Sequence, residues 1–378
     1  MHPPADHPSI PAADLKVVPV ERSDTIPSSW YVDPRFHALE RDAVFGANWQ
    51  LVGRLDQVER PGQFLVGTVA DEPIIVVRGK DGALRAFFNV CRHRGGPLAF
   101  CDGQASALRC QYHGWTYLLD GSLRGVPQMD RSELFDKKDF GLTPVAVDTW
   151  EGLVFVHLGP KPAPVARTFA GILERIGPRA LAGMQFARRV NYEVACNWKV
   201  YVDNYLEGYH VPFVHPELAT LLDYAGYTTE TFDRYSLQSS PMTGEGSPYD
   251  TAGGTATAYY YFVFPNVMLN ILPGRLQTNV VQPLGPDRCR VVFDYFYQRA
   301  GSAALEAQVE ADVAYSDKVQ EEDREICEHV QRGLSSRAYD RGRFSPEMEA
   351  GVHHFQKLLK QAYAARMKPA PRRRRPTK

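Results

Sequence analysis

Residues Asn197–Pro216 read NWKVYVDNYLEGYHVPFVHP, and the interpretation of the whole chain starts from this stretch. Asp203, Glu207, His210 and His215 fall within thirteen of its residues, and each is a potential metal ligand or proton carrier. The apolar and aromatic residues between them are typical of a protein core. Polar groups in such surroundings are costly unless a partner satisfies them. A metal ion is such a partner, so the stretch predicts a metal site.

The spacing within this stretch predicts a helix over Val200–Tyr209. Glu207 and His210 are three residues apart and therefore share a helix face. His215 lies five residues beyond His210, but Pro212 disfavours helix there and lets the chain turn back toward His210. The alternative is a helix end that carries two ordinary polar histidines. The helix itself is indicated by tyrosines at every fourth position, Tyr201, Tyr205 and Tyr209.

Length and composition limit the classes of protein to consider. The chain has 378 residues, 44% of them hydrophobic and 23% charged, which suits two or three globular domains. Its formal net charge is -1, so nothing global points to nucleic acid or to a membrane surface as a partner. No apolar run is long enough to span a bilayer, and the N-terminus lacks the pattern of a signal peptide. The expected location is therefore the cytoplasm.

The first half of the chain is predicted to hold a small antiparallel β domain. Residues 1–29 are rich in proline and polar residues and are expected to form a loose arm, and Pro34–Trp49 has the apolar spacing of a helix. From Trp49 to Val90, short β-branched and aromatic runs alternate with turns. Trp150–Leu158 is the expected closing strand, and Pro160–Pro164 is a stiff connector that marks the domain boundary.

Two short loops of this β domain each supply one cysteine and one histidine. Cys91 and His93 form C-x-H, and sixteen residues later Cys110 and His113 form C-x-x-H. A zinc site also accepts two cysteines and two histidines, but zinc fingers usually pair cysteine with cysteine and histidine with histidine. One cysteine and one histidine from each loop is typical of a Rieske [2Fe–2S] cluster, in which one iron binds two thiolates and the other binds two imidazoles.

These loops resemble the Rieske domain of the Rieske non-heme iron oxygenases, in NVCRHRGG (89–96) and CQYHGW (110–115). The resemblance covers nearly all of residues 40–340. It implies an α+β fold with a small antiparallel β Rieske domain and a helix-grip (START-like) catalytic domain that has an antiparallel sheet and a long C-terminal helix. The expected domains are an N-terminal arm and helix that pack with the catalytic domain (1–44), the Rieske domain (45–160), the catalytic domain (165–366) and a disordered basic tail (367–378).

The second half of the chain is predicted to form a larger sheet followed by a long helix. Ala303–Leu334 has many charges and an apolar stripe, as in a helix with one solvated face. A carboxylate from this helix would complete, with His210 and His215, the two-histidine, one-carboxylate triad of non-heme Fe(II). The family has its third ligand at the position of Asp323, and Glu322 is the alternative if the register differs by one. Strands are expected at Phe186–Ala195, Tyr259–Leu272, Thr278–Pro283 and Arg288–Gln298, with a long loop at Ser240–Ala258.

The resemblance further implies a division of labour between two metal centres. Each subunit is expected to bind one [2Fe–2S] cluster and one mononuclear Fe(II), in a head-to-tail homotrimer. A separate reductase or ferredoxin would pass electrons from NAD(P)H to the cluster, and the iron would use O2 to oxidise a small organic substrate. In the family, a carboxylate three residues before the first iron histidine links it to the cluster of a neighbouring subunit. Glu207 stands at that position, with Asp203 and Asn204 one turn away as its expected supports.

The presence of Glu at position 207 also bears on the substrate. Ring-hydroxylating members usually have Asp there, and the surrounding motifs are more similar to the choline monooxygenase, glycine-betaine and carnitine oxygenase branch, which hydroxylates or demethylates quaternary amines. Tyr259–Phe262 would suit an aromatic cage for such a cation, or simply alternate between the faces of a buried strand. The alternatives are hydroxylation of an aromatic ring, a Rieske-type electron carrier and a zinc-stabilised binding module. Arg372–Arg375 in the tail indicates a solubilising end or an anchor for acidic partners.

Overall fold

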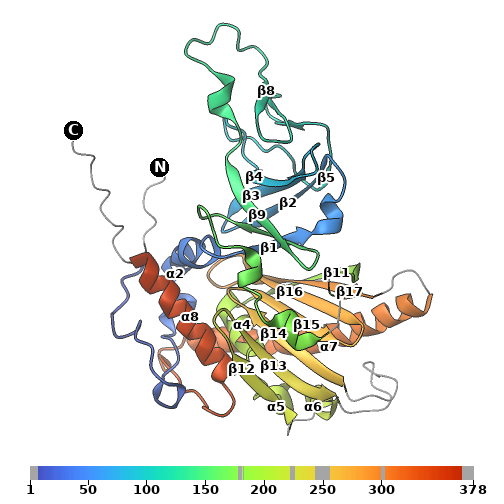
Figure 1. The fold of residues 1–378 in the computed structure, drawn as a ribbon. Helices are drawn as coiled ribbons and strands as arrows, with labels where there is room; N and C mark the ends of the chain where they lie inside the picture. The colour runs from blue at the N-terminus through green and yellow to red at the C-terminus, as the bar shows by residue number, and fades with distance from the viewer. Residues whose placement is uncertain are drawn as a thin grey trace. The chain divides into compact units, whose positions relative to one another are not determined.

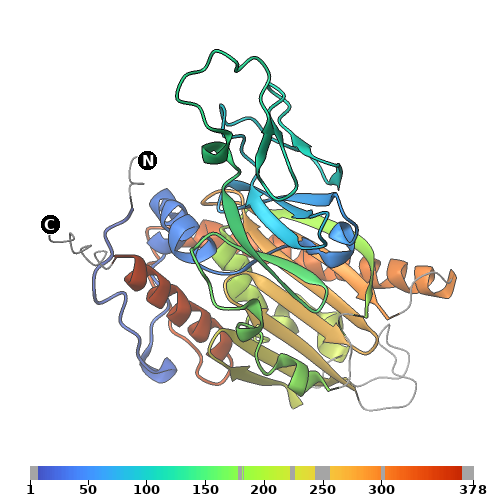
Figure 2. The ribbon, with the colours of Figure 1, turned by 45° about the horizontal axis from the view of Figure 1, so that its top comes forward.

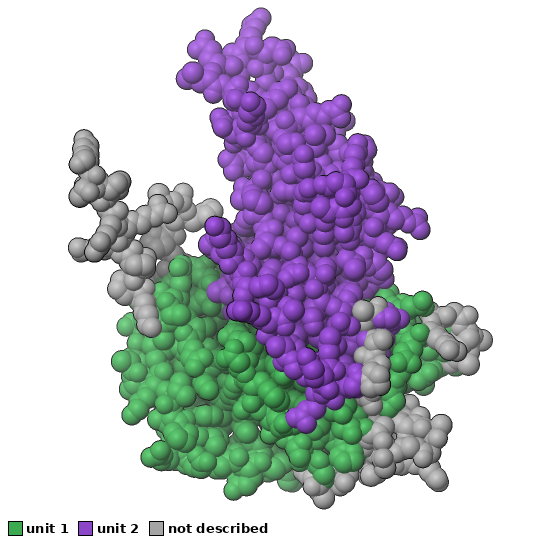
Figure 3. Space-filling model, viewed as in Figure 1, with its two compact units in different colours: residues 1–44, 185–378 green, residues 45–184 purple. Residues whose placement is uncertain are grey.

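The computed structural model describes residues 7–177, 181, 183–221, 226–242, 256–298 and 303–367. The chain divides into two compact units, which Figure 3 colours separately. One comprises residues 45–184, and the other combines residues 1–44 with 185–378. The basic tail and most of the predicted loop at 240–258 lie outside the described residues. Among the helices that are described, none has the length and apolar content needed to cross a bilayer.

Unit 45–184 is built on two antiparallel sheets (Figure 1). The smaller sheet has three short strands, two of which flank the second Cys–His loop, so the sheet positions that loop directly. Its strands are β6 (Leu108–Arg109), β7 (Thr116–Tyr117) and β8 (Leu123–Gly125). The larger sheet has the order β1 (Gln50–Arg54), β10 (Leu153–His157), β9 (Pro144–Trp150), β4 (Leu84–Phe88), β3 (Glu72–Arg78), β2 (Gln63–Val69) and β5 (Gly103–Gln104).

The end of this unit differs from the sequence prediction in two ways. The strand predicted at 150–158 is β10, but it begins only at Leu153, because residues 151–152, both with positive φ angles, form the turn of its hairpin with β9. The unit also continues past the proline-rich connector, because the next residues pack back onto it. Phe169 stacks on Trp150 at a centroid distance of 4.2 Å, and the Val165 N–H donates to Asp148 Oδ2 at 2.9 Å. The division between units therefore falls at residue 184 rather than at 160–164.

The other unit is a seven-stranded antiparallel sheet with a long helix, α7 (Ala303–Leu334), against one face (Figures 1 and 2). The helix has the predicted bounds. The predicted strand at 259–272 is instead the hairpin of β14 and β15, and α8 (Ala350–Met367), which packs on β12 and β13, was not predicted. The strand order is β11 (Gln185–Val194), β17 (Cys289–Tyr297), β16 (Arg275–Pro283), β15 (Val267–Leu272), β14 (Ala256–Val263), β13 (Tyr235–Met242) and β12 (Thr228–Thr231).

Short helices complete the described secondary structure of both units. In the unit that contains the larger helices, α1 (Ser29–Val32) and α2 (Pro34–Glu40) precede the sheet in sequence. The apolar stripe predicted for this region is buried there. Trp30 stacks on Phe36 at a centroid distance of 5.4 Å and lies 4.9 Å from the ring of Tyr363 in α8. The remaining α-helices are α3 (Ile172–Ile176), α4 (Trp198–Tyr205), α5 (Val211–Val214) and α6 (Pro216–Leu221). A π-helical turn follows α2 at Arg41–Phe45, and 3-10 turns lie at Val20–Arg22, Leu55–Val58, Lys137–Phe140 and Val165–Arg167.

The stretch Asn197–Pro216 forms two helices rather than one. Asn197 caps α4 by accepting the Lys199 N–H at 3.0 Å, but α4 ends at residue 205, four residues earlier than predicted. Glu207 explains the early end, because its carboxylate accepts the backbone N–H groups of residues 209 and 210 and so competes with a continuing helix. Pro212 does not break a helix. It lies in the first turn of α5, where the missing N–H costs nothing.

Candidate metal centres and adjoining cavity

The two Cys–His loops come together as the sequence predicts. The Cys91 and Cys110 side chains are buried and interact with each other, whereas His93 and His113 are exposed with ring centroids 4.8 Å apart. Gly96 makes room for the second loop, since a Cβ at this position would lie 2.9 Å from Cys110 Sγ. Two buried thiols and two solvent-side imidazoles fit a Rieske cluster, whose histidine-bound iron faces outward.

Tyr117 is a residue of this centre that sequence reasoning missed. Its hydroxyl lies 3.2 Å from Cys91 Sγ and accepts the Arg92 N–H at 2.9 Å. Because that acceptor role is filled by the backbone, the hydroxyl proton is directed toward the sulfur. Burial raises the pKa of the Cys91 thiol, while this hydrogen bond acts in the opposite direction and favours the thiolate. A thiolate is the form that binds iron. Tyr117 follows the second loop in β7, but its contact with the first loop has no sequence signal.

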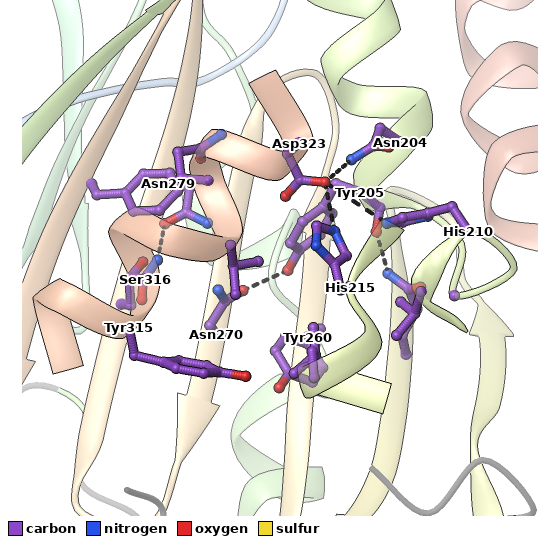
Figure 4. A pocket seen from close by; sticks show the side chains of 18 of the residues that line it. Asn204, Tyr205, His210, His215, Tyr260, Asn270, Asn279, Tyr315, Ser316 and Asp323 are labelled. Atoms are coloured by element: carbon purple, nitrogen blue, oxygen red, sulfur yellow. Dashed lines mark hydrogen bonds and ion pairs between the residues drawn. The ribbon is translucent and has the colours of Figure 1, made fainter. Parts of the chain in front are cut away.

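His210, His215 and Asp323 converge in the other unit. One ligand atom from each lies within 4.8 Å of the other two. Asp323 Oδ1 is 2.9 Å from His215 Nε2 and 3.8 Å from His210 Nε2, and the dashed lines in Figure 4 join it to both rings. The segment after α4 supplies the histidines, and α7 supplies the carboxylate across more than a hundred residues of sequence. This is the donor set of a two-histidine, one-carboxylate iron site.

Each of the two histidines uses its other ring nitrogen to contact a second carboxylate. His210 Nδ1 lies 2.7 Å from Glu207 Oε1, and His215 Nδ1 lies 2.7 Å from Glu322 Oε2. Burial lowers the pKa of His215, but the hydrogen bonds and charges of Asp323 and Glu322 outweigh this effect and raise it. A metal ion among the Nε2 atoms would replace the proton there. Carboxylates on the far nitrogens fix the ring orientation, as around many metal sites.

The two residues predicted to support Glu207 lie elsewhere. Asn204 donates from Nδ2 to Asp323 Oδ1 at 2.7 Å, so it orients a member of the triad rather than Glu207. The prediction for Asp203 is corrected, because its carboxylate accepts from the Tyr31 hydroxyl at 2.5 Å and from Gln356 Nε2 at 3.4 Å. Burial raises the pKa of Asp203 to about 7. Asp203 belongs to the packing of α4 and has no contact with the triad among the hydrogen bonds of the described residues.

A cavity of about 180 Å³ adjoins the triad. That volume corresponds to about six water molecules at roughly 30 Å³ each, so it suits a small molecule. Of the predicted cage at 259–262, Tyr260 alone lines it; the other aromatic rings come from different elements. Figure 4 shows Tyr205, Tyr260 and Tyr315 around this space, and the Tyr205 hydroxyl donates to Asn270 Oδ1 at 2.7 Å. The aromatic lining consists of Tyr201, Tyr205, Tyr227, Tyr260, Phe293 and Tyr315.

The two donor sets together define a protein with a cluster-type centre and a separate mononuclear iron centre. Comparison with known families agrees: residues 48–150 match the Rieske [2Fe-2S] domain, and residues 181–365 match the ring hydroxylating alpha subunit (catalytic domain). The chain therefore belongs to the Rieske non-heme iron oxygenases, as an oxygenase α subunit. It is an oxidoreductase with one [2Fe–2S] cluster and one mononuclear iron. The predicted family and fold class are confirmed, and an isolated electron carrier or a zinc module is excluded.

Individual relatives support this assignment over nearly the whole chain. Choline monooxygenase of Arabidopsis thaliana is 39% identical over 90% of this chain and 83% of its own length. The carnitine monooxygenase oxygenase subunit of Acinetobacter baumannii is 30% identical over 89% of this chain and 94% of its own. A quaternary ammonium Rieske monooxygenase has a TM-score of 0.83 at 28% identity, covering 92% of this chain and 99% of its own. Naphthalene 1,2-dioxygenase from Rhodococcus, at 21% identity and a TM-score of 0.74, shares the fold.

Proposed function

We propose that this chain is the terminal oxygenase of a multicomponent system that hydroxylates or demethylates a small quaternary amine. The observation that carries the proposal is the small cavity lined by tyrosines beside the two-histidine, one-carboxylate triad. Aromatic faces attract quaternary ammonium groups, which cannot donate hydrogen bonds. The names of the relatives point the same way, since choline and carnitine are both quaternary amines.

In this proposal Cys91, Cys110, His93 and His113 hold the cluster, and His210, His215 and Asp323 hold the iron. When bound, the cluster supplies electrons singly and the iron activates O2. The protein's part is to orient these ligands, to hold the ammonium group against the tyrosines and to limit water in the cavity. A separate NAD(P)H-dependent reductase or ferredoxin is the proposed electron source.

We also retain Glu207 as the proposed link between the iron site and the cluster of a neighbouring subunit in a homotrimer. Each unit has exposed aromatic side chains beside the residues concerned. Tyr209 is 51% exposed and Phe213 is 80% exposed, close in sequence to Glu207 and His210. On the Rieske unit, Tyr112 is 58% exposed next to His113. Large exposed aromatic groups favour docking of another protein surface. A second copy of the chain would cover the exposed aromatic groups of both units.

A substrate screen with a reconstituted reductase tests the proposed function. O2 uptake and product formation are measured with choline, carnitine and glycine betaine, and with benzoate and naphthalene as aromatic comparisons. The expected result is coupled O2 uptake and product with at least one quaternary amine. Product from an aromatic ring alone would overturn the substrate class. The His210→Ala variant serves as the control, because it should keep the cluster spectrum and lose mononuclear iron and turnover.

A further inference from the structure

Asn270 presents an amide group to the cavity beside the triad. It lies on β15, between β14 and β16, and it is the one residue of this strand that is not fully buried. Neighbouring strands cover both edges of β15, so the accessible part of Asn270 lies on a face of the sheet. On that face the side chain lines the cavity, and Figure 4 shows it reaching into this space with its oxygen toward the Tyr205 hydroxyl. The amide is therefore within reach of a molecule in the cavity.

The Tyr205 hydroxyl determines which end of the amide is open. It donates to Asn270 Oδ1 at 2.7 Å, a distance typical of an O–H···O bond and shorter than the usual N–H···O bond. Asn270 Nδ2 donates to none of the described residues and is not enclosed by them. Tyr205 precedes His210 by five residues, so the segment that supplies the triad histidines also holds this donor in a set place.

Tyr260 and Asn270 stand side by side on this face of the sheet. They lie directly opposite each other on β14 and β15, and Gln277 on β16 is the next residue in the same row. Opposite side chains of an antiparallel pair have Cβ atoms about 5 Å apart. Gln277 also lines the cavity, but its Nε2 already donates to Asn279 Oδ1 at 2.8 Å. The row therefore offers an aromatic ring and, next to it, the open N–H group of Asn270.

An open donor at this place discriminates between the molecules that cover it. Water solvates such a donor, and a molecule that fills the cavity displaces that water. Carbon atoms against Nδ2 would leave its N–H group unpaired, which is unfavourable, whereas an oxygen atom would accept the hydrogen bond. An alcohol hydroxyl and a carboxylate are both suitable acceptors. A small molecule with an ammonium group against the Tyr260 ring and an oxygen a few bonds away satisfies both side chains.

We propose that Asn270 binds an oxygen atom of the substrate through Nδ2 while the ammonium group lies against Tyr260. This inference rests on the proposed function and narrows it to quaternary amines that carry an oxygen acceptor close to the nitrogen. Asn270 contacts the substrate in this account and leaves the metal ligands untouched. Its role is to select and orient the substrate.

The test uses two pairs of ligands in which methyl groups replace the oxygen atoms. Choline is paired with propyltrimethylammonium, and glycine betaine with isobutyltrimethylammonium. All four are titrated by calorimetry into the anaerobic iron-loaded protein, as wild type, Asn270→Leu and Gln277→Leu. Gln277→Leu is the matched control from the same row, because the Gln277 amide nitrogen already has a partner. If Asn270→Leu does not fold, Tyr205→Phe/Asn270→Leu replaces it and is compared with Tyr205→Phe, since removing both partners of a hydrogen bond leaves neither unpaired.

We expect the preference for at least one oxygen-bearing ligand over its methyl analogue to be about tenfold lower in Asn270→Leu than in wild type. The pair that responds distinguishes an alcohol from a carboxylate. Gln277→Leu should keep the wild-type preference, and an equal loss there would overturn the inference. Equal preferences in wild type and Asn270→Leu for both pairs, while the ligands bind, overturn this inference alone. If wild type binds none of the four ligands, the proposed substrate class fails and this inference fails with it.

Discussion

Three consecutive carboxylates on α7, Glu321, Glu322 and Asp323, should make three different contributions to iron binding. Asp323 contacts both histidines of the triad, and Glu322 contacts the far nitrogen of His215 at 2.7 Å. Glu321 pairs with Arg324 on the solvent side. The three residues have similar chemistry and neighbouring positions, so differences among their variants report contact with the site rather than helix stability.

The expected magnitudes follow from these contacts. A hydrogen bond to a charged group contributes about 1.5–3 kcal/mol, or roughly 10–100-fold in a binding constant. Glu322 is 31% exposed, so solvent screening places Glu322→Gln at the lower end, about a tenfold loss of iron affinity. Asp323→Ala removes one of three protein ligands and should leave almost no mononuclear iron. Glu321→Gln should bind iron as wild type does.

Iron retention measures these differences directly. Each variant is dialysed against graded concentrations of a chelator, and total iron is compared with acid-labile sulfide, which reports the cluster alone. The expected order of retention is Glu321→Gln, then Glu322→Gln, then Asp323→Ala, with the cluster intact in all three. Full mononuclear iron in Asp323→Ala would refute the assignment of the third ligand. Equal losses in the Glu321 and Glu322 variants would show that helix charge, not contact with His215, sets the affinity.

Three further changes test other contacts. Glu207→Gln should weaken iron binding at least as much as Glu322→Gln does, because it removes the matching carboxylate from His210. Loaded with saturating iron, this variant should still form product about 10–100-fold more slowly in steady-state assays. Wild-type turnover of the iron-loaded variant would contradict this. Tyr117→Phe should lower the reduction potential of the cluster by about 40 mV in a redox titration. The reason is that the lost hydrogen bond, worth roughly 1 kcal/mol, stabilises the reduced cluster, which is more negative. An unchanged potential would show that the Tyr117 hydroxyl does not stabilise the reduced cluster. Lys199→Met should lower the free energy of unfolding by about 3–5 kcal/mol in urea titrations, because the charge of Glu40 stays buried without the cation that balances it. Adding Glu40→Gln to Lys199→Met should recover part of that loss. If the losses of the two single variants simply add in the double variant, the ion pair does not stabilise the fold.

The residues of the two donor sets were predictable because metal-binding chemistry limits residue type and spacing. A Rieske cluster needs one cysteine and one histidine from each of two loops, and the sequence has this at Cys91 to His113. The bounds of α7 were likewise predictable, since its charges and apolar stripe form one continuous pattern. In contrast, tyrosines recur at every fourth position as far as Tyr209, whereas α4 ends at residue 205. There the side chain of Glu207 takes backbone N–H groups, and a periodic pattern does not register such competition.

Contacts between distant segments were not predictable from one sequence. Asn204 reaches Asp323 across 119 residues, and Tyr201 reaches Gln320 across the same separation. Both contacts depend on how α4 lies against α7, which is set by the packing of the whole unit. Local spacing contains no information on that packing, so Asp203 and Asn204 looked equivalent beside Glu207. The structure separates them, because adjacent residues on a helix point in different directions.

The packing of α4 explains how segments far apart in the sequence contribute to the iron site. One face carries Lys199, which forms an ion pair of 2.6 Å with Glu40 where both side chains are almost fully buried, and the Tyr363 hydroxyl donates to the same carboxylate at 2.5 Å. The N-terminal helix α2 and the C-terminal helix α8 thus fix α4 from one side. At Gly351, the start of α8 also packs so closely on the backbone before Glu207 that a Cβ would lie 2.4 Å from the Leu206 carbonyl oxygen. A ligand site must be held to within fractions of an ångström. The precision of the triad therefore depends on helices that supply none of its ligands.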